Sequence, residues 1–309
     1  MIYTITLNPS IDCYLKIGKP LMFDEVNRAD EEVYKTGGKG INVSNDLSLL
    51  GISSTAIALL GGFTGRYIQE SLSSNSLIKV CAIPIEGSNR INVKIHQDHK
   101  AICVNGKGPQ VSESVQEDII NALSSLTDDD WVMVCGSSIK GFDGDFFSKI
   151  ADIVHIRRAK LVVDMENLTL EQLKDYRPYL IKPNLYELQL IMKESNITSD
   201  NVVSYLSKAC ENGPENILVS MGADGAILAT CDGFYQLIQP NDVAVNKVGA
   251  GDAMLAAFVG KCSEGCSFEE SLCWAGAAGN AVASTLEDAD LKLIQDYLPK
   301  MSVNKIEKD

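Results

Sequence analysis

The strongest constraint on the fold is an alternation between apolar runs of strand length and segments with helical spacing. Residues 54–60 are apolar at nearly every position, which is typical of a strand buried on both faces of a parallel sheet. Similar strands are predicted at 2–7, 77–83, 131–135, 160–164, 178–182, 216–220, 225–230 and 233–238. Helices are predicted up to Gly51 and at 64–74, 113–126, 144–157, 199–212, 251–262, 267–284 and 289–297. This order predicts an α/β fold with a mostly parallel sheet covered by helices.

Two parts of the first half depart from this alternation. Residues 90–96 and 101–104 alternate apolar and polar side chains around a polar turn, which predicts an antiparallel hairpin. Residues 13–17 and 26–35 alternate as well, and the second segment is rich in charge, which indicates a sheet with one wet face. We expect one domain over 1–309, with a small antiparallel lid formed by segments about 12–36 and 88–106.

The composition excludes several classes of partner and ligand. The formal net charge of −14 argues against nucleic acid, and an anionic ligand would need local Lys, Arg and backbone N–H groups. The nine cysteines show no CxxC spacing and only three histidines are present, so zinc binding is not expected. No apolar stretch is long enough to span a bilayer and no signal segment precedes the first strand, so we expect no membrane association and a reducing, cytoplasmic location.

Gly249-Ala250-Gly251-Asp252 precedes an apolar helical run and is the first candidate for chemistry. A loop with so few side chains can direct several N–H groups of a helix N-terminus at one anion. Asp252 would repel that anion unless it works on a neutral hydroxyl, as a phosphoryl-transfer site requires. The alternative is an ordinary loop in which Asp252 is the N-cap of the following helix.

Gly37-Gly38-Lys39-Gly40 also precedes a helix and can present backbone donors to a ligand. It is not a Walker A loop, because no Ser or Thr follows the lysine, and no GxGxxG follows a strand anywhere in the chain. The alternative is a plain turn.

Three charged residues of the lid segments could contact a ligand. Asp12 follows the first strand, where ligand sites of open α/β sheets tend to lie, and it could accept hydrogen bonds from sugar hydroxyls or only form a turn. Arg90 and Lys94 fall on one face of a lid strand, where they could clamp an anion or merely keep the strand soluble.

Two further motifs suit a nucleotide and its metal ion. Asn184 and Glu187 follow an apolar strand at a spacing that suits Mg²⁺ held through waters, although the same pair resembles a helix capping box. The segment 220–225 joins two strands with two glycines and could border a nucleotide or form a plain hairpin.

Together these motifs, in this order, resemble the pfkB-type carbohydrate kinases of the ribokinase superfamily over essentially the whole chain. The resemblance implies a ribokinase-like three-layer sandwich, with helices on both faces of the central sheet, and a single kinase domain. It implies that Asp252 is the catalytic base and that Gly249, Ala250 and Gly251 form the anion hole. The sugar would be held by Asp12, Gly38, Lys39, Asn42, Arg90 and Ser137. ATP would contact Asn184, Ser220, Gly222, Ala223, Asp224, Gly225, Gly249, Gly251 and Asn280, and Asn184 and Glu187 would organise Mg²⁺.

Within that family, Asn-Pro-Ser-Ile-Asp at 8–12, Gly-Gly-Lys-Gly-Ile-Asn at 37–42 and Arg-Ile-Asn-Val-Lys at 90–94 look most like the phosphosugar branch. The resemblance therefore implies an ATP-dependent kinase of a ketohexose phosphate, first fructose 1-phosphate, with formation of fructose 1,6-bisphosphate. Alternatives are a tagatose-6-phosphate kinase, a 6-phosphofructokinase, or a non-catalytic sensor of sugar or nucleotide on the same fold. A homodimer through the lid is expected. Lys247 departs from the family pattern and adds a positive charge beside the glycine motif.

Overall fold

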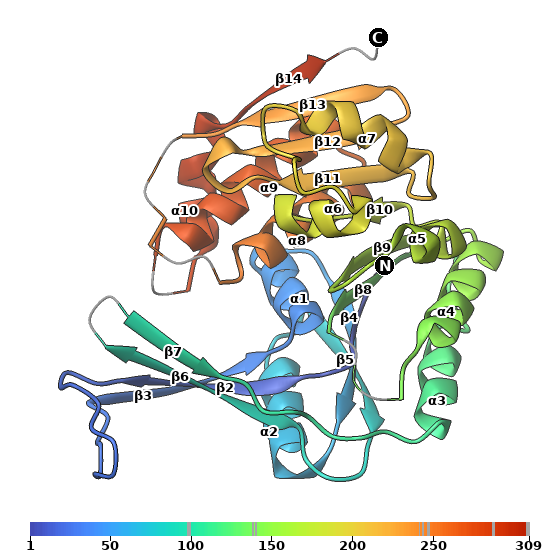
Figure 1. The fold of residues 1–309 in the computed structure, drawn as a ribbon. Helices are drawn as coiled ribbons and strands as arrows, with labels where there is room; N and C mark the ends of the chain where they lie inside the picture. The colour runs from blue at the N-terminus through green and yellow to red at the C-terminus, as the bar shows by residue number, and fades with distance from the viewer. Residues whose placement is uncertain are drawn as a thin grey trace.

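The computed structural model describes residues 1–97, 100–137, 139, 141–240, 242, 244–245, 248–285 and 288–306. Its centre is a ten-stranded sheet (Figure 1). In spatial order the strands are β14 (Ser302–Ile306), β13 (Gly233–Ile238), β12 (Ala226–Thr230), β11 (Asn216–Ser220), β10 (Leu180–Ile181), β9 (Lys160–Met165), β8 (Trp131–Gly136), β1 (Ile2–Thr6), β4 (Ser54–Leu60) and β5 (Ile78–Pro84).

The sheet is parallel from β5 to β11 and antiparallel from β11 to β14. Every residue of β4 is buried, as its continuous apolar run predicted. The change of direction comes at β11 to β13, which follow one another through short turns, whereas β14 is antiparallel to β13 although helices α8 to α10 lie between them in the chain. The carboxyl ends of the parallel strands therefore meet along one edge, where ligand sites of such sheets lie.

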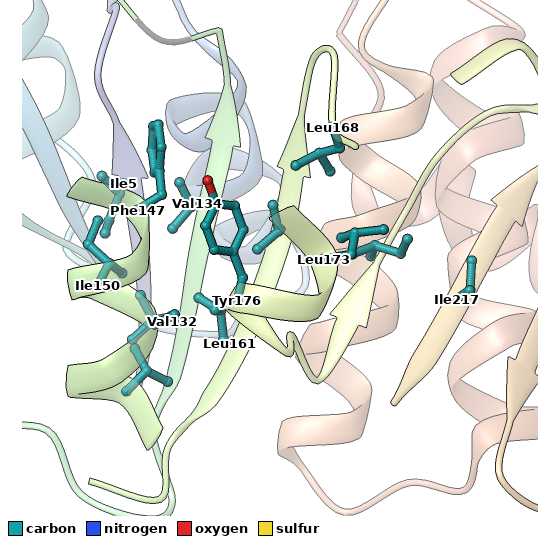
Figure 2. Close-up of a cluster of buried hydrophobic side chains, with 14 of the residues drawn as sticks. Ile5, Val132, Val134, Phe147, Ile150, Leu161, Leu168, Leu173, Tyr176 and Ile217 are labelled. Carbon is teal, nitrogen blue, oxygen red and sulfur yellow. The ribbon is translucent and has the colours of Figure 1, made fainter. Parts of the chain in front are cut away.

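Helices cover both faces of the large sheet, which confirms the three-layer prediction. One layer holds α3 (Ser114–Ala122), α4 (Gly144–Ile156), α5 (Leu170–Tyr176), α6 (Leu185–Met192) and α7 (Val202–Cys210). Figure 2 shows the core beneath this layer, where Phe147 and Ile150 of α4 pack against Val134 and Leu161. These side chains come from alternate strand positions, so the same strands present a second apolar set to the opposite face.

The opposite layer holds α1 (Lys39–Leu49), α2 (Gly62–Ser73), α8 (Ala250–Ser263), α9 (Phe268–Ala283) and α10 (Leu291–Tyr297). Every residue of α8 from Asp252 to Gly260 is buried, because this helix is enclosed by the sheet, α1 and α9. Gly260 permits the close approach to α1, since a Cβ there would lie 3.0 Å from Leu47 Cδ2. This contact holds the starts of α1 and α8 in a fixed relation.

The lid is a separate four-stranded sheet in the order β3 (Glu31–Gly37), β2 (Ser10–Lys16), β6 (Arg90–Gln97) and β7 (Lys100–Val104), drawn at the lower left of Figure 1. The two outer pairs are antiparallel and the central pair, β2 with β6, is parallel. The predicted strand at 26–35 begins later, at Glu31. Residues 22–27 instead form a turn in which Asn27 exchanges hydrogen bonds with Met22.

Helix α5 and strand β14 were not predicted, and of helix α6 only the start at Asn184 was anticipated. The helices span only seven and eight residues, too short to repeat an apolar stripe. β14 is an edge strand whose side chains are exposed or half-buried, so it lacks an apolar signal. Among the described residues, no helix combines the length and the apolar character needed to cross a membrane.

Candidate active site

Two helix N-termini capped by glycine meet at the carboxyl edge of the sheet. α1 starts after Gly38 (φ 116°) and α8 after Gly249 (φ 86°), and neither N-cap has a side-chain hydrogen bond. Both backbones need the positive φ that glycine tolerates. Asn42 Nδ2 donates to Asp252 Oδ2 at 2.8 Å and joins the two first turns. The uncapped N–H groups of both helices are therefore available to an anion near this junction.

Asp252 is the third residue of α8, so the alternative in which it is the N-cap is wrong; the N-cap is Gly249. Its side chain points into a buried environment and only 8% of the residue is exposed. Burial raises the pKa of Asp252 above its usual value, while the hydrogen bond from Asn42 lowers it. Such a carboxylate is a stronger proton acceptor than an exposed aspartate once it is ionised.

A buried charge network lies beneath this junction and was not predicted. Asp164, at the end of β9, is 3% exposed, and its two carboxylate oxygens lie 3.4 Å from Lys39 Nζ and 3.7 Å from Lys182 Nζ. Burial lowers the pKa of Lys39, but the charges of Asp164 and Asp252 outweigh this and raise it overall. Lys182 Nζ also lies beside the α8 start, 3.2 Å from the position of a Cβ on Gly251. Two cations are thus fixed next to the uncapped helix ends.

The sequence holds a signal for this network. Asp164 and Lys182 are the first charged residues after the apolar runs of β9 and β10, and adjacent parallel strands end side by side. The order β8, β9, β10 within the sheet was the missing information. The same two residues and Glu187 line a small pocket whose apolar wall is formed by Leu190 and Ile191 of α6.

Asp12 is held at the site-facing side of the lid by three hydrogen bonds. Ser10 Oγ and Asn92 Nδ2 each donate to Oδ1 at 2.8 Å, and Lys94 Nζ donates to Oδ2 at 2.6 Å. Asp12 lies close to the loop before α1, because a Cβ on Gly37 would be 2.7 Å from Asp12 Oδ1. Asp12 belongs to strand β2, so the alternative in which it only forms a turn is wrong.

Arg90 lies on the same face as Asp12 but has a different environment from Lys94. Arg90 is half-buried, and its Nε has no hydrogen-bond partner among the described residues. Burial lowers the pKa of Arg90, and the nearby charges of Asp12 and Glu166 act in the opposite direction. Lys94, in contrast, already has two hydrogen-bond acceptors. Arg90 is thus the lid cation with free donor capacity.

Ser137 directly follows β8 and is half-buried. Gly136 before it has φ 93°, and a Cβ there would lie 3.5 Å from Lys39 Cβ. The end of β8 is therefore packed against the start of α1, which brings Ser137 near the Lys39 backbone. Lys247 lies outside the described residues.

Asn184 and Glu187 form the capping box that was the alternative to a metal site. Asn184 Oδ1 accepts from the Glu187 N–H, and one Glu187 oxygen accepts from the Asn184 N–H, each at 2.9 Å. The second Glu187 oxygen is left available. Within the described part of the chain no group of three or more His, Cys, Asp and Glu side chains could cage a metal. The residues fit a divalent ion held by few protein oxygens, with waters and phosphates completing its shell.

A third set of residues gathers at the antiparallel end of the sheet. Asn184 and Ser220 form an isolated parallel bridge, which places the α6 start beside the end of β11. The turn after β11 includes the 3-10 helix Gly222–Asp224 and ends at Gly225, with Ala223 and Asp224 exposed. The segment 220–225 is thus a hairpin turn, which was one of the two predicted alternatives. Its exposed residues remain accessible to a ligand.

Gln239, which the sequence did not single out, ties Asn280 to this turn. Asn280 Nδ2 of α9 donates to Gln239 Oε1 at 2.9 Å, and Gln239 Nε2 donates to the Gly222 carbonyl at 2.8 Å. The amide of one residue thereby holds α9 and the turn at a fixed separation. The predicted nucleotide-binding residues from three distant segments lie along this connected edge.

Comparisons with known proteins cover nearly the whole chain. The model of the pfkB family carbohydrate kinases matches residues 2–292. D-tagatose-1-phosphate kinase of Bacillus licheniformis is 35% identical over 99% of this chain and 100% of its own length. 1-Phosphofructokinase of Bacillus subtilis is 33% identical over 99% of this chain and 100% of its own. Phosphofructokinase-2 of Escherichia coli, solved with fructose-6-phosphate, shares the fold with a TM-score of 0.88 at 24% identity, covering 96% of this chain and 98% of that one.

Proposed function

Because this chain belongs to the pfkB family of carbohydrate kinases, we propose that it transfers the γ-phosphoryl group of ATP to the free primary hydroxyl of a ketohexose 1-phosphate. Fructose 1-phosphate is the first candidate acceptor, with fructose 1,6-bisphosphate as product. The observation that carries this proposal is the Asn42–Asp252 hydrogen bond at the junction of two uncapped helix N-termini. It supports the proposal because a buried carboxylate lies beside backbone N–H groups that could bind an anion.

Asp252 would accept the proton of the attacking hydroxyl in an in-line transfer. The transition state is loose, so the proton moves late and positioning contributes most of the rate. The N–H groups of Gly249, Ala250 and Gly251 would stabilise the transferring phosphoryl group, with Lys182 beside them. Lys39 would carry part of the compensating charge.

The sugar would lie between the lid and the α1 start. Asp12, Gly38, Asn42 and Ser137 would contact its hydroxyls, and Lys39 would reach it from the first turn of α1. Arg90 would bind the phosphate the acceptor already carries, since a guanidinium with free N–H groups suits a phosphate through two-pronged contacts.

ATP would lie along the edge that runs from Asn184 to Asn280, with its adenosine portion beside residues 220–225. Kinases of this family use ATP with a divalent metal, and we propose Mg²⁺. Asn184 and the free oxygen of Glu187 would hold Mg²⁺ through waters, and the ion would offset phosphate charge during the transfer.

A second acceptor, tagatose 1-phosphate, is favoured by the 35% identical relative that bears its name. Tagatose differs from fructose only in the configuration at one ring carbon, so both sugars would present the same hydroxyl to Asp252. Tagatose 6-phosphate and fructose 6-phosphate remain alternatives, and they would require the opposite orientation of the phosphate.

The acceptor is tested by measuring kcat/KM for these four sugar phosphates at fixed ATP and Mg²⁺. We expect the 1-phosphates to exceed the 6-phosphates, and Asp252→Asn to lower kcat by orders of magnitude with an unchanged melting temperature. An absence of turnover with every acceptor, together with tight nucleotide binding, would instead support a sensor on a kinase fold. Near-normal turnover of Asp252→Asn contradicts the proposed base.

We also propose a homodimer formed through the outer face of the lid, the face opposite Asp12. On this face Tyr34, Cys13, Val93 and Val104 are cross-strand partners in one row across the four strands. Tyr34 and Val104, at the two ends of the row, are 49% and 59% exposed. Cys13 in the middle of this row is buried, but exposed apolar side chains on both edge strands are typical of an interface. Val104→Asp should give a monomer in light scattering. Val33→Asp, on the face that carries Asp12, is the control and should stay dimeric; a monomeric wild type contradicts the proposal.

A further inference from the structure

We propose that Lys94 determines the preference for a phosphorylated acceptor indirectly, by neutralising Asp12, and that it does not bind the acceptor's phosphate itself. This inference rests on the proposed function as a sugar-phosphate kinase. It assigns Lys94 a positioning role and leaves phosphate binding to Arg90.

The parallel register between β2 and β6 creates this arrangement. Asp12 lies opposite Asn92, and Tyr14 lies opposite Lys94, so the lysine reaches back across the strands to both acidic and phenolic oxygens. Lys94 Nζ donates to Asp12 Oδ2 at 2.6 Å and to the Tyr14 hydroxyl at 2.8 Å. The ammonium group also lies 4.6 Å from the centre of the Tyr14 ring. Asp12 and Tyr14 thus engage two of the three N–H donors of Lys94, and the Tyr14 ring adds a cation–π contact.

The ion pair is partly shielded from water, since the side chains of Lys94 and Asp12 are only 12% and 13% exposed. Charges in such a place are screened less than on the open surface. Burial lowers the pKa of Lys94, yet its contacts with Asp12 and Tyr14 outweigh this and raise it. The lysine therefore stays charged at neutral pH and cancels the negative charge of Asp12.

This cancellation matters because Asp12 is predicted to contact a sugar that carries a phosphate. Asp12 Oδ1 already accepts from Ser10 and Asn92, so the carboxylate is oriented even without Lys94. Removing Lys94 would leave an oriented, negatively charged carboxylate facing an anionic acceptor. A neutral sugar would lose nothing comparable, because it carries no charge for Asp12 to repel.

The environment of Arg90 separates this idea from direct binding of phosphate by both cations. Arg90, four residues before Lys94 on the same face, is half-buried, and its buried Nε has no hydrogen-bond partner among the described residues. Lys94 would have to break the contacts with Asp12 and Tyr14 before it could reach a phosphate. In this arrangement Arg90 is available to bind the ligand, and Lys94 is engaged by Asp12 and Tyr14 of the protein.

The test compares binding of fructose 1-phosphate with that of unphosphorylated fructose, the latter measured as a competitive inhibitor. We expect Lys94→Met to weaken the phosphorylated ligand about tenfold or more relative to fructose, because like charges then oppose each other. The double variant Asp12→Asn/Lys94→Met should recover most of this ratio. Tyr14→Phe, which keeps both charges, is the matched control and should leave the ratio unchanged.

Two results would overturn the inference. If Asp12→Asn does not restore the ratio, Lys94 holds the phosphate directly; if Lys94→Met weakens both ligands equally, the lysine only supports the lid. Should Lys94→Met not fold, Lys94→Gln removes the same charge and carries the same expectations. A wild-type enzyme that phosphorylates no sugar phosphate refutes the proposed function instead, and that result is visible before any variant is made.

Discussion

Replacing Asp164 with Asn should destabilise the protein and weaken ATP binding at the same time. Asp164 is a buried carboxylate whose partners, Lys39 and Lys182, would keep their charges in the variant. Lys182 is itself only 6% exposed, so it would remain buried without its counter-ion. Removing one member of a buried ion pair is strongly destabilising for this reason.

The expected loss is smaller than for an ideal buried pair. Breaking such a pair costs roughly 3–5 kcal/mol. Here the N–O distances are 3.4 and 3.7 Å, longer than a charge-assisted hydrogen bond of about 2.7–2.9 Å, and Lys39 is 28% exposed. We therefore expect a loss of about 2 kcal/mol, which corresponds to a fall in melting temperature of roughly 3 °C for a chain of 309 residues.

The assay combines thermal unfolding with steady-state kinetics, and Asp130→Asn is the matched control. Asp130 is 5% exposed and pairs with the N-terminal ammonium at 2.9 Å, but its strand end is opposite to the site. Both variants should unfold at lower temperature. Only Asp164→Asn should raise KM for ATP, because only Asp164 pairs with Lys182, which lies beside the start of α8.

An unchanged melting temperature for Asp164→Asn would refute the reasoning, since it would mean that the buried lysines do not depend on this charge. An equal rise of KM in Asp130→Asn would refute it as well, because the effect would then follow from stability alone. The double variant Asp164→Asn/Lys182→Met should be more stable than Asp164→Asn, as the uncompensated buried charge is removed with its partner.

Three further predictions follow. Asn42→Ala removes the hydrogen bond that lowers the pKa of Asp252; since the base acts when ionised, the acid limb of the pH profile of kcat/KM should move to higher pH. Gln239→Ala should raise KM for ATP severalfold and leave KM for the sugar phosphate unchanged, because its contacts join the nucleotide edge only. Gly225→Ala should lower the melting temperature more than Gly265→Ala. Both glycines have φ 86°, but a Cβ on Gly225 would lie 2.3 Å from a β13 carbonyl oxygen, and a Cβ on Gly265 would meet nothing within 4 Å. Equal losses would show that backbone strain alone decides.

The central sheet and the lid could be predicted because their strands carry distinct patterns. The strand at 54–60 is apolar from residue 56 onward and was predicted with its observed bounds. The hairpin at 90–97 and 100–104 alternates as a sheet with one wet face does. Short elements escaped this approach. α5 and α6 begin with capping boxes at Thr169 and Asn184, but neither is long enough to repeat an apolar stripe.

The site was predictable where its chemistry resides in contiguous motifs and not where it depends on sheet order. Asn42 and Asp252 belong to glycine-containing motifs that predict helix starts, although their hydrogen bond joins segments 210 residues apart. Asp164 and Lys182 have no such motif. Each is a single charge at the end of an apolar strand, and their pairing arises only because β9 and β10 are neighbours in the sheet.

The way in which α1 and α8 begin distinguishes them from the five helices that have a side-chain cap. α4, α5, α6, α9 and α10 all start with a side-chain cap from Asp, Thr, Asn or Ser. α1 and α8 start with glycine, as α2 does at Gly61, and glycine at an N-cap forgoes roughly a few tenths of a kcal/mol relative to the best residues. A side-chain oxygen at either N-cap would occupy the N–H groups that an anion needs. The stability lost at Gly38 and Gly249 therefore leaves two sets of donors open at the place where Asn42 holds Asp252, and the same glycines permit the positive φ that directs both chain segments there.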